Sequence, residues 1–188
     1  MLVEPFAPLF GLPEAVCDRA RHLTVERIPI KEAARLNERW HSVLPDIATG
    51  LRIHDDARRA YAATFDNGIY GVAVWTRPIA ANRMAHPTPH LLELRRLAIP
   101  DYAPKFTATR MLGQMRRLIQ KELPEVCRLI SYQATDVHSG TIYKAANWTA
   151  TNRQEKYAGW DHRGEGRRVG QNQSEKVRWE LQVRDCDE

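Results

Sequence analysis

The sequence predicts an α/β (α+β) fold, a single domain in which helices flank a mixed central β-sheet. The first observation is a hairpin signal, Asp66-Asn67-Gly68, between two apolar segments. An Asn-Gly pair suits the type I′ turn, whose two central residues need positive φ. The second observation is that two strand-then-helix units follow the hairpin, an order that places parallel strands in one sheet. The third is the length of 188 residues, which is enough for one domain with a real core.

Hydrophobic periodicity predicts the individual elements, because strands repeat every two residues and helices every 3.6. The helical pattern is clearest between Met111 and Ile119, where apolar residues share one face. In chain order we expect a strand at 23–30, a helix at 31–43, a polar loop at 45–59, hairpin strands at 61–65 and 69–76, a proline-containing loop at 78–89, a strand at 91–99, a helix at 106–123, a strand at 126–132, a helix capped by Asp136 or Ser139 and closed by Asn147-Trp148, and last strands near 157–160 and 177–183.

The domain itself is expected to span residues 23–188. Residues 1–22 are expected to form an N-terminal arm or docking element, because Pro5, Pro8 and Pro13 precede only a short helical stretch near 14–21.

The chain is basic, with a formal net charge of +5 and a sequence pI of about 9.3. The excess is uneven, since residues 149–178 hold seven Lys/Arg against four acidic residues. Such an excess suits an anionic partner, either a cofactor phosphate or nucleic acid, and equally a solvated basic surface. Charge alone leaves these alternatives open.

Cysteine usage and hydropathy bear on location. Cys17, Cys127 and Cys186 are odd in number and far apart, which predicts neither a disulfide framework nor a zinc site. No apolar run approaches the length of a membrane span, and no signal-peptide pattern opens the chain. The expected location is therefore the cytoplasm, with no metal site and no membrane partner.

The segment from Ser131 to Trp148 gathers the side chains best suited to chemistry. It places a hydroxyl, a carboxylate, an imidazole, a phenol and an amide where a buried strand gives way to a helix. Open sheets usually bind ligands at the carboxyl ends of their strands. The sequence therefore predicts a site at this crossing.

Two blocks carry a family resemblance. Leu92-Glu93-Leu94-Arg95-Arg96-Leu97-Ala98-Ile99 resembles the central strand that binds the pantetheine arm of coenzyme A in GCN5-related N-acetyltransferases. His138-Ser139-Gly140-Thr141-Ile142-Tyr143-Lys144-Ala145-Ala146-Asn147-Trp148 resembles a block in phage and mobile-element relatives of the Mom DNA-modification protein. The element order resembles the acetyltransferase fold from about residue 23 to residue 183.

The resemblance implies an acyl-CoA-dependent transferase, with acetyl-CoA as donor and double-stranded DNA as partner. In the Mom-like group the acceptor is the exocyclic amine of adenine. The fold resemblance alone says little about substrate. The cofactor contacts that it implies come from Leu97, Ala98, Ile99, Lys105, Phe106, Thr107, Ala108, Thr109, Arg110 and Asn147.

The sequence departs from the family pattern in two places. Acetyltransferases usually hold the pyrophosphate in a glycine-rich loop, whereas residues 103–109 contain no glycine. Amides in the first turn of the following helix still point at an anion, and Lys105, Arg110 and a Thr107 or Thr109 hydroxyl would add to them. The resemblance also implies an Asp soon after the strand. Gln133 and Ala134 fill that region here, and Asp136 lies closer to His138.

Four side chains are catalytic candidates. By resemblance, Tyr143 faces the thioester sulfur and protonates the leaving thiolate; the alternative is a ring packed on the sheet. Asp136 orients or deprotonates the amine, or caps a helix. His138 has the same two readings. Ser131 binds substrate or cofactor, or is an ordinary strand residue.

Other residues carry weaker readings. Glu93 is a base acting through water or half of a structural ion pair with Arg95 or Arg96. His41 lines a substrate cleft or lies exposed. For the whole protein, two alternatives to DNA modification stay open: an acetyltransferase for a small or protein amine, and a non-catalytic nucleic-acid-binding module that the glycine-free loop favours.

Overall fold

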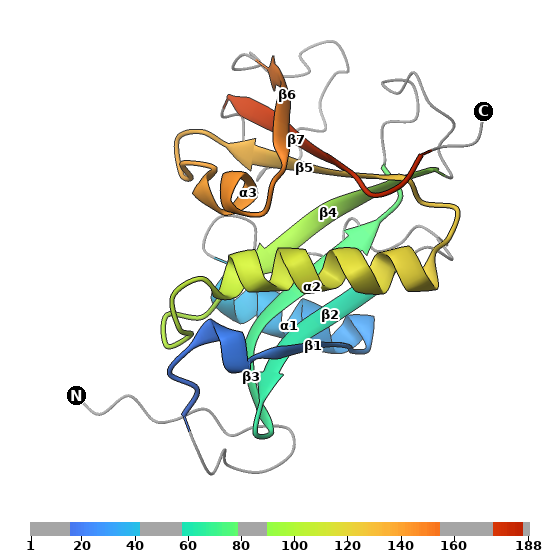
Figure 1. The fold of residues 1–188 in the computed structure, drawn as a ribbon. Helices are drawn as coiled ribbons and strands as arrows, with labels where there is room; N and C mark the ends of the chain where they lie inside the picture. Colours follow the sequence, from blue (N-terminus) through green and yellow to red (C-terminus); the bar gives the residue numbers. More distant parts are fainter. Residues whose placement is uncertain (1–15, 42–57, 79–89, 155–174, 186–188) are drawn as a thin grey trace, which may run out of the picture.

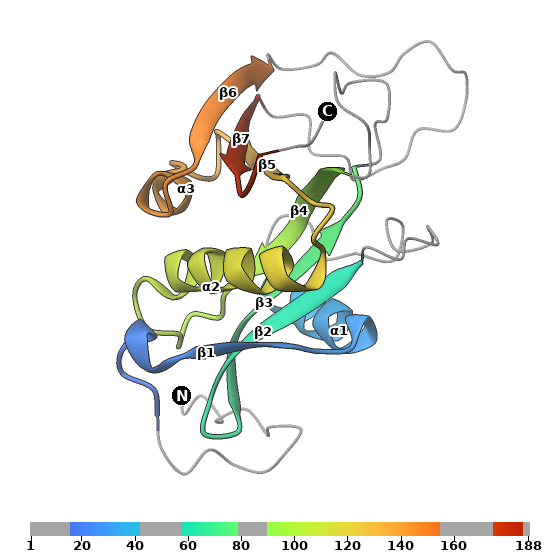
Figure 2. The same ribbon diagram turned by 45° about the vertical axis from the view of Figure 1, so that its right-hand side comes forward.

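The computed structural model describes residues 16–41, 58–78, 90–154 and 175–185. They form one mixed sheet with strand order β1-β2-β3-β4-β5-β7-β6. Helix α1 covers one face of this sheet, and α2 and α3 cover the other (Figure 1), as the turned view in Figure 2 also shows. The elements are η1 (Ala20–His22), β1 (Thr24–Arg27), α1 (Ile30–Trp40), β2 (Arg59–Phe65), β3 (Gly68–Thr76), β4 (Leu91–Ala98), α2 (Thr107–Glu122), β5 (Arg128–Ala134), α3 (Thr141–Ala145), β6 (Thr149–Gln154) and β7 (Lys176–Gln182).

The core has one part on each face of the sheet. On the α1 face, Ala33 and Leu36 pack against small and branched side chains of β2 and β3. On the other face, the predicted helical stripe of α2 is confirmed: Met111, Met115 and Ile119 are all 0% exposed. The α/β class and the mixed sheet predicted from the sequence are therefore confirmed.

The predicted hairpin is also confirmed, but its turn lies one residue earlier. The left-handed residues are Asp66 (φ 44°) and Asn67 (φ 60°), while Gly68 is already the first residue of β3. Asp and Asn tolerate this conformation better than other side chains do, so the turn closes without glycine at either central position.

The segment before β1 and the segment around α3 differ most from the elements that the sequence predicts. Among the described residues before β1, which begin at position 16, a 3₁₀ turn forms at Ala20–His22. Helix α3 is short, begins at Thr141, and has Gly140 rather than Asp136 or Ser139 at its N-cap position. Strand β6 then begins directly at Thr149. The strand expected near 157–160 lies outside the described residues.

The central feature is the place where β4 and β5 part. These parallel strands pair only from Leu91–Arg128 to Leu94–Ser131. Beyond that point β4 continues to Ala98 with β3 as its strand partner, after a bulge in which Arg95 is the extra residue. The strands therefore diverge at their carboxyl ends, where open sheets bind ligands.

Within the described ranges, no helix is long and apolar enough to cross a membrane. Cys17 has a free, buried thiol. Cys127 is disulfide-bonded, against the expectation from the odd cysteine count.

Candidate active site

A pair of hydroxyl groups lies where β4 and β5 separate. The Tyr143 hydroxyl is 2.8 Å from Ser131 Oγ, and Ser131 Oγ also donates to the Leu94 carbonyl oxygen at 3.4 Å. Both side chains are buried, with 8% and 2% exposure. Burial raises the pKa of Tyr143, and the Ser131 hydrogen bond opposes that effect only in part. The structure therefore brings two of the four catalytic candidates together and keeps the phenol protonated.

Two tryptophans fix the Tyr143 ring. It stacks on Trp179 with ring centroids 5.4 Å apart and meets the edge of Trp148 at 5.5 Å. Such aromatic pairs contribute about 0.5–1.5 kcal/mol each beyond the area that they bury. The phenol consequently points its hydroxyl at Ser131 from one defined position.

Gln133 joins this aromatic group to the loop after β5. Its Oε1 accepts a 2.7 Å hydrogen bond from Trp179 Nε1, and its Nε2 donates to the His138 carbonyl oxygen. The side chain is buried, so both halves of the amide are satisfied inside the protein. The sequence showed Gln133 only as a departure from the family pattern. The signal available in the sequence was a glutamine at the end of a strand that is otherwise mostly apolar. It could have indicated that Gln133 makes buried hydrogen bonds.

The loop itself carries Asp136 and His138, and both side chains are exposed. The loop closes through the His138 backbone N–H, which donates to the Ala134 carbonyl oxygen at 3.1 Å. In the described parts of the chain, neither side chain is hydrogen-bonded to the Ser131–Tyr143 pair. Neither is a helix cap, since Gly140 takes that position.

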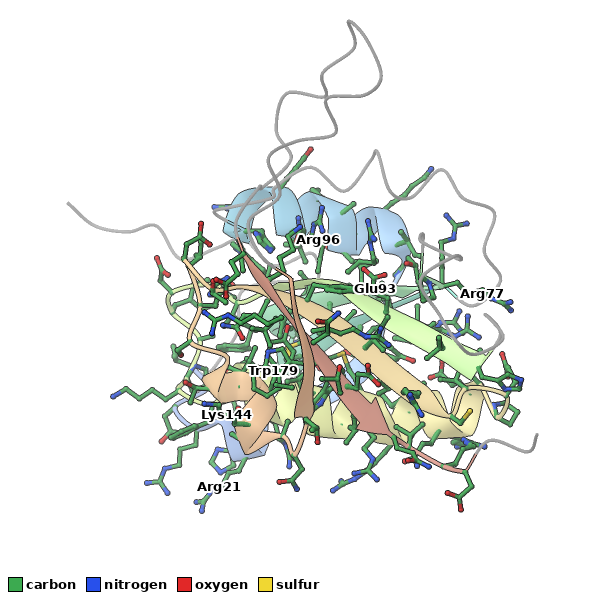
Figure 3. The ribbon with its side chains drawn as sticks, turned by 90° about the horizontal axis from the view of Figure 1, so that it is seen from above. Arg21, Arg77, Glu93, Arg96, Lys144 and Trp179 are labelled. Atoms are coloured by element: carbon green, nitrogen blue, oxygen red, sulfur yellow. The ribbon has the colours of Figure 1, made fainter. Side chains whose placement is uncertain are left out.

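A second set of polar groups lies on the α1 side. His41 follows α1 as its C-cap residue and is half-buried, so the interpretation of His41 as an exposed histidine is wrong. Burial, followed by the charges of Arg96 and His138, lowers the pKa of His41 to about 4. Figure 3 shows Arg96 and Glu93 toward α1, and Trp179 toward the opposite face. Three segments distant in sequence thus contribute to one basic, partly buried surface.

Glu93 is the acid on this side. Arg95 Nη1 donates to Glu93 Oε1 at 3.0 Å, which confirms the ion pair that the sequence suggested. Burial raises the pKa of Glu93, while the neighbouring Arg95, Arg96 and Lys176 charges lower it. Removing a carboxylate from water favours its protonated form.

The lowered pKa of His41 predicts a pH dependence of stability. Because the folded-state value of about 4 lies below the ordinary 6.5, neutral His41 is favoured by folding. Its contribution is complete above about pH 6.5 and declines as the pH falls toward 4. In ¹H–¹³C NMR titrations, the His41 ring should titrate near pH 4. His41→Gln should flatten the loss of stability in urea between pH 6.5 and 4. A His41 midpoint at or above 6.5 would contradict this description.

The N-terminus of α2 is the predicted pyrophosphate site. Phe106, which precedes the helix, has φ 71° and is 78% exposed. Among the described residues, the backbone N–H groups of Ala108 and Thr109 have no acceptor, as is usual for the first turn. No acidic residue lies in that turn, and Lys105 beside it is exposed. The turn therefore presents amides and positive charge.

Two predicted phosphate contacts have other partners. The Thr107 hydroxyl is buried and donates to the Pro104 carbonyl oxygen at 2.7 Å. Arg110 donates to the backbone carbonyls of Arg21 (3.2 Å) and Leu23 (3.4 Å). Arg110 thus holds the end of the N-terminal segment against α2. Figure 3 shows Arg21 and Lys144 at this same end of α2.

The φ value of Phe106 predicts a stabilising substitution. A left-handed conformation costs a non-glycine residue about 1–2 kcal/mol, and Phe106 is too exposed to gain much from packing. Phe106→Gly should raise the free energy of unfolding by about 0.5–1 kcal/mol after the extra entropy of unfolded glycine is subtracted. Phe106→Ala removes the ring but keeps the conformation, so it should give no gain. Equal stabilities for the two variants in urea denaturation would refute the assignment of strain.

The remaining predicted cofactor residues follow the diverging strand and α3. Leu97 and Ile99 pack against the core on the α2 face, and Ala98 belongs to the α1-face core. Asn147 is exposed after α3 with φ 61°. The backbone of β4 from Leu97 onward therefore borders the gap between β4 and β5.

The basic C-terminal surface is partly neutralised. Arg178 pairs with Glu180 at 2.8 Å, and Arg128 pairs with the same carboxylate at 3.3 Å. Arg153 pairs with Glu175. The other basic residues counted between 155 and 174 lie outside the described parts of the chain. In those parts, no group of three or more His, Cys, Asp or Glu is placed to hold a metal ion.

Comparison with solved structures shows the fold. The ribosomal-protein-S18-alanine N-acetyltransferase from Escherichia coli superposes with a TM-score of 0.62 at 12% identity, covering 88% of this chain and 97% of that one. An acetyltransferase from Bacillus subtilis in complex with CoA gives 0.56 at 13%, covering 85% and 98%. A GNAT-family acetyltransferase from Streptococcus pneumoniae gives 0.55 at 14%, also covering 85% and 98%. The chain thus has the GCN5-related N-acetyltransferase fold.

No curated protein matches the sequence. A family model does: the model described as the Mom protein family matches residues 22–182. That range contains every described strand and helix except the first residues of η1. The chain belongs to the Mom protein family.

Proposed function

We propose that this protein is an acyl-CoA-dependent N-acyltransferase that modifies the exocyclic amine of adenine in double-stranded DNA. The observation that carries the proposal is the buried Ser131–Tyr143 hydroxyl pair at the point where β4 and β5 diverge. Membership in the Mom family supports DNA as the acceptor, since the family resemblance implies that substrate.

The residues that line this gap fit an acyl-CoA. Its pyrophosphate suits the first-turn amides of Ala108 and Thr109, with Lys105 beside them. Its pantetheine arm suits the β4 backbone at 97–99, and its thioester then reaches Ser131. The Bacillus subtilis acetyltransferase, which has a similar fold, was solved in complex with CoA. This supports an acyl-CoA as the donor for the present protein. Phe106 adopts a left-handed φ. The loop before α2 therefore takes a conformation that glycine usually supplies in the pyrophosphate loop of acetyltransferases.

Tyr143 supplies the acid in this proposal. The amine nitrogen attacks the thioester carbonyl carbon, the C–N bond forms, and the C–S bond breaks. The departing thiolate takes the Tyr143 proton. The Ser131 hydroxyl then donates a hydrogen bond to the Tyr143 phenolate oxygen. A phenol whose pKa is raised by burial remains protonated until the thiolate forms.

The α1 side suits the acceptor. An adenine amine is neutral and weakly nucleophilic, so positioning and charge stabilisation matter more than deprotonation. Neutral His41 can accept a hydrogen bond from the amine, whose proton passes to water, and Arg96 nearby can bind the DNA phosphate or the base. Donor and acceptor would then approach the gap from opposite faces of the sheet.

One observation favours a different acceptor. Arg153 and Arg178, two of the three described basic residues of β6 and β7 that the sequence offered for DNA, are ion-paired with acids. A small amine or a protein amine needs no such surface. DNA binding that weakens steeply with salt supports the DNA acceptor, whereas negligible DNA affinity supports the amine.

Calorimetry with acetyl-CoA tests the donor. We expect heat of binding for the wild-type protein and weaker binding for Lys105→Ala, which lacks the exposed charge beside α2. Arg117→Ala is the matched control, because Arg117 is an exposed cation of the same helix. An absence of binding heat over a range of temperatures would leave only a non-catalytic module.

A further inference from the structure

One buried hydrogen-bond donor beside Tyr143 has no acceptor. Trp148 is 5% exposed, and its indole Nε1 has no hydrogen-bond partner among the described residues. The other two core tryptophans differ: Trp75 Nε1 donates to Met115 Sδ at 3.2 Å, and Trp179 Nε1 donates to Gln133. Buried polar groups nearly always have partners, so an unsatisfied one needs an explanation.

The sheet register places this indole at the gap between β4 and β5. Trp75, Leu94, Ser131 and Trp179 are consecutive partners across β3, β4, β5 and β7. This is the last row before β4 and β5 part. Tyr143 covers the Trp179 end of the row and Trp148 covers the Trp75 end, with ring centroids 6.3 Å apart in the second pair.

We propose that the Trp148 indole N–H donates a hydrogen bond to the carbonyl oxygen of the bound acyl thioester. This inference rests on the proposed acyltransferase function. In a thioester the carbonyl carbon is bonded directly to the sulfur, so the donor to its oxygen must lie beside the acid that serves the sulfur. Trp148 meets that condition, since its ring centroid is 5.5 Å from that of Tyr143.

The interaction would assist the reaction itself. As the amine attacks, negative charge develops on the carbonyl oxygen, and a fixed donor in a water-excluded site stabilises it. The Trp148 backbone amide donates to the Tyr143 carbonyl oxygen at 3.0 Å, and the indole ring is packed between the Tyr143 and Trp75 rings. Acid and donor therefore come from one short, rigid segment.

Two-dimensional ¹H–¹⁵N NMR of the tryptophan indoles tests the proposal, with Trp148→Phe used to assign the resonance. We expect the Trp148 N–H to shift downfield on addition of acetyl-CoA. With free CoA, which lacks the thioester carbonyl, it should stay near its unliganded position. A similar shift with both ligands would assign the donor to a pantetheine amide and overturn the thioester contact.

Kinetics provide the second measurement. Loss of one such donor lowers kcat by about 10²–10³, so Trp148→Phe should lower kcat in that range and keep the Kd for CoA within about twofold. Trp40→Phe, at the half-exposed end of α1, controls for loss of an indole away from the gap. If acetyl-CoA binds the wild type and the Trp148 resonance does not move, this inference fails while the proposed function stands. If acetyl-CoA does not bind at all, the proposed function fails first.

Discussion

Tyr143→Phe is expected to lower turnover by about 10²–10⁴, the range that a positioned acid supplies. The substitution removes one oxygen and keeps the ring between Trp179 and Trp148. Stability should therefore change little beyond the loss of one hydrogen bond to Ser131, about 1 kcal/mol. The measurement is release of free thiol from acetyl-CoA in the presence of adenine-containing duplex DNA, with acetyl-CoA affinity measured in parallel.

Ser131→Ala separates the acid from its support. This variant leaves the phenol in place but removes its 2.8 Å partner. We expect a smaller loss of turnover than for Tyr143→Phe and a change in the pH profile, because the Ser131 bond acts on the pKa of Tyr143.

Tight acetyl-CoA binding with unchanged turnover in Tyr143→Phe would remove Tyr143 from the mechanism.

Gly140→Ala is expected to be the most destabilising small substitution in the site. A Cβ at this position would lie 2.4 Å from Gln133 Oε1 and 2.6 Å from the Trp179 ring, and the backbone has φ +72°. The left-handed conformation adds about 1–2 kcal/mol and overpacking about 1–3 kcal/mol. We expect a loss of roughly 3 kcal/mol in urea unfolding, with the Trp179–Gln133 hydrogen bond disturbed.

Gly113→Ala is the matched control for that change. Gly113 lies in α2, and a Cβ there would meet nothing within 4 Å. Alanine is the better helix former, so this variant should gain about 0.5–1 kcal/mol. The double variant Gly140→Ala with Gln133→Ala should lose less stability than the sum of the two single variants, because the closest clash is with the Gln133 side chain. Similar stability changes for Gly140→Ala and Gly113→Ala would show that the cap is not constrained.

Local patterns predicted the regular elements well. The stripe of α2 and the hairpin depend on neighbours in sequence, and both formed, with the hairpin turn at Asp66-Asn67 rather than at the expected Asn67-Gly68. Helix α3 was harder, since its start depends on the left-handed φ of Gly140 and on contacts with Gln133 and Trp179. The Trp179 contact joins segments that are far apart in the chain.

The candidate site was predictable only in part. Tyr143 and Ser131 were named from the sequence, and the structure joins them by a hydrogen bond. The divergence of β4 and β5 is a property of strand register, which periodicity does not report. The surroundings of His41 and the unsatisfied Trp148 donor also depend on tertiary packing. No pattern along the chain indicates either one.

Mass analysis of nucleosides tests the central proposal most directly. DNA would be isolated from cells that express the wild-type protein or the Tyr143→Phe variant at matched levels. The account predicts a new adenine nucleoside of higher mass with the wild type and at least a hundredfold less of it with the variant. Unmodified DNA in cells whose wild-type protein consumes acetyl-CoA would contradict the DNA acceptor.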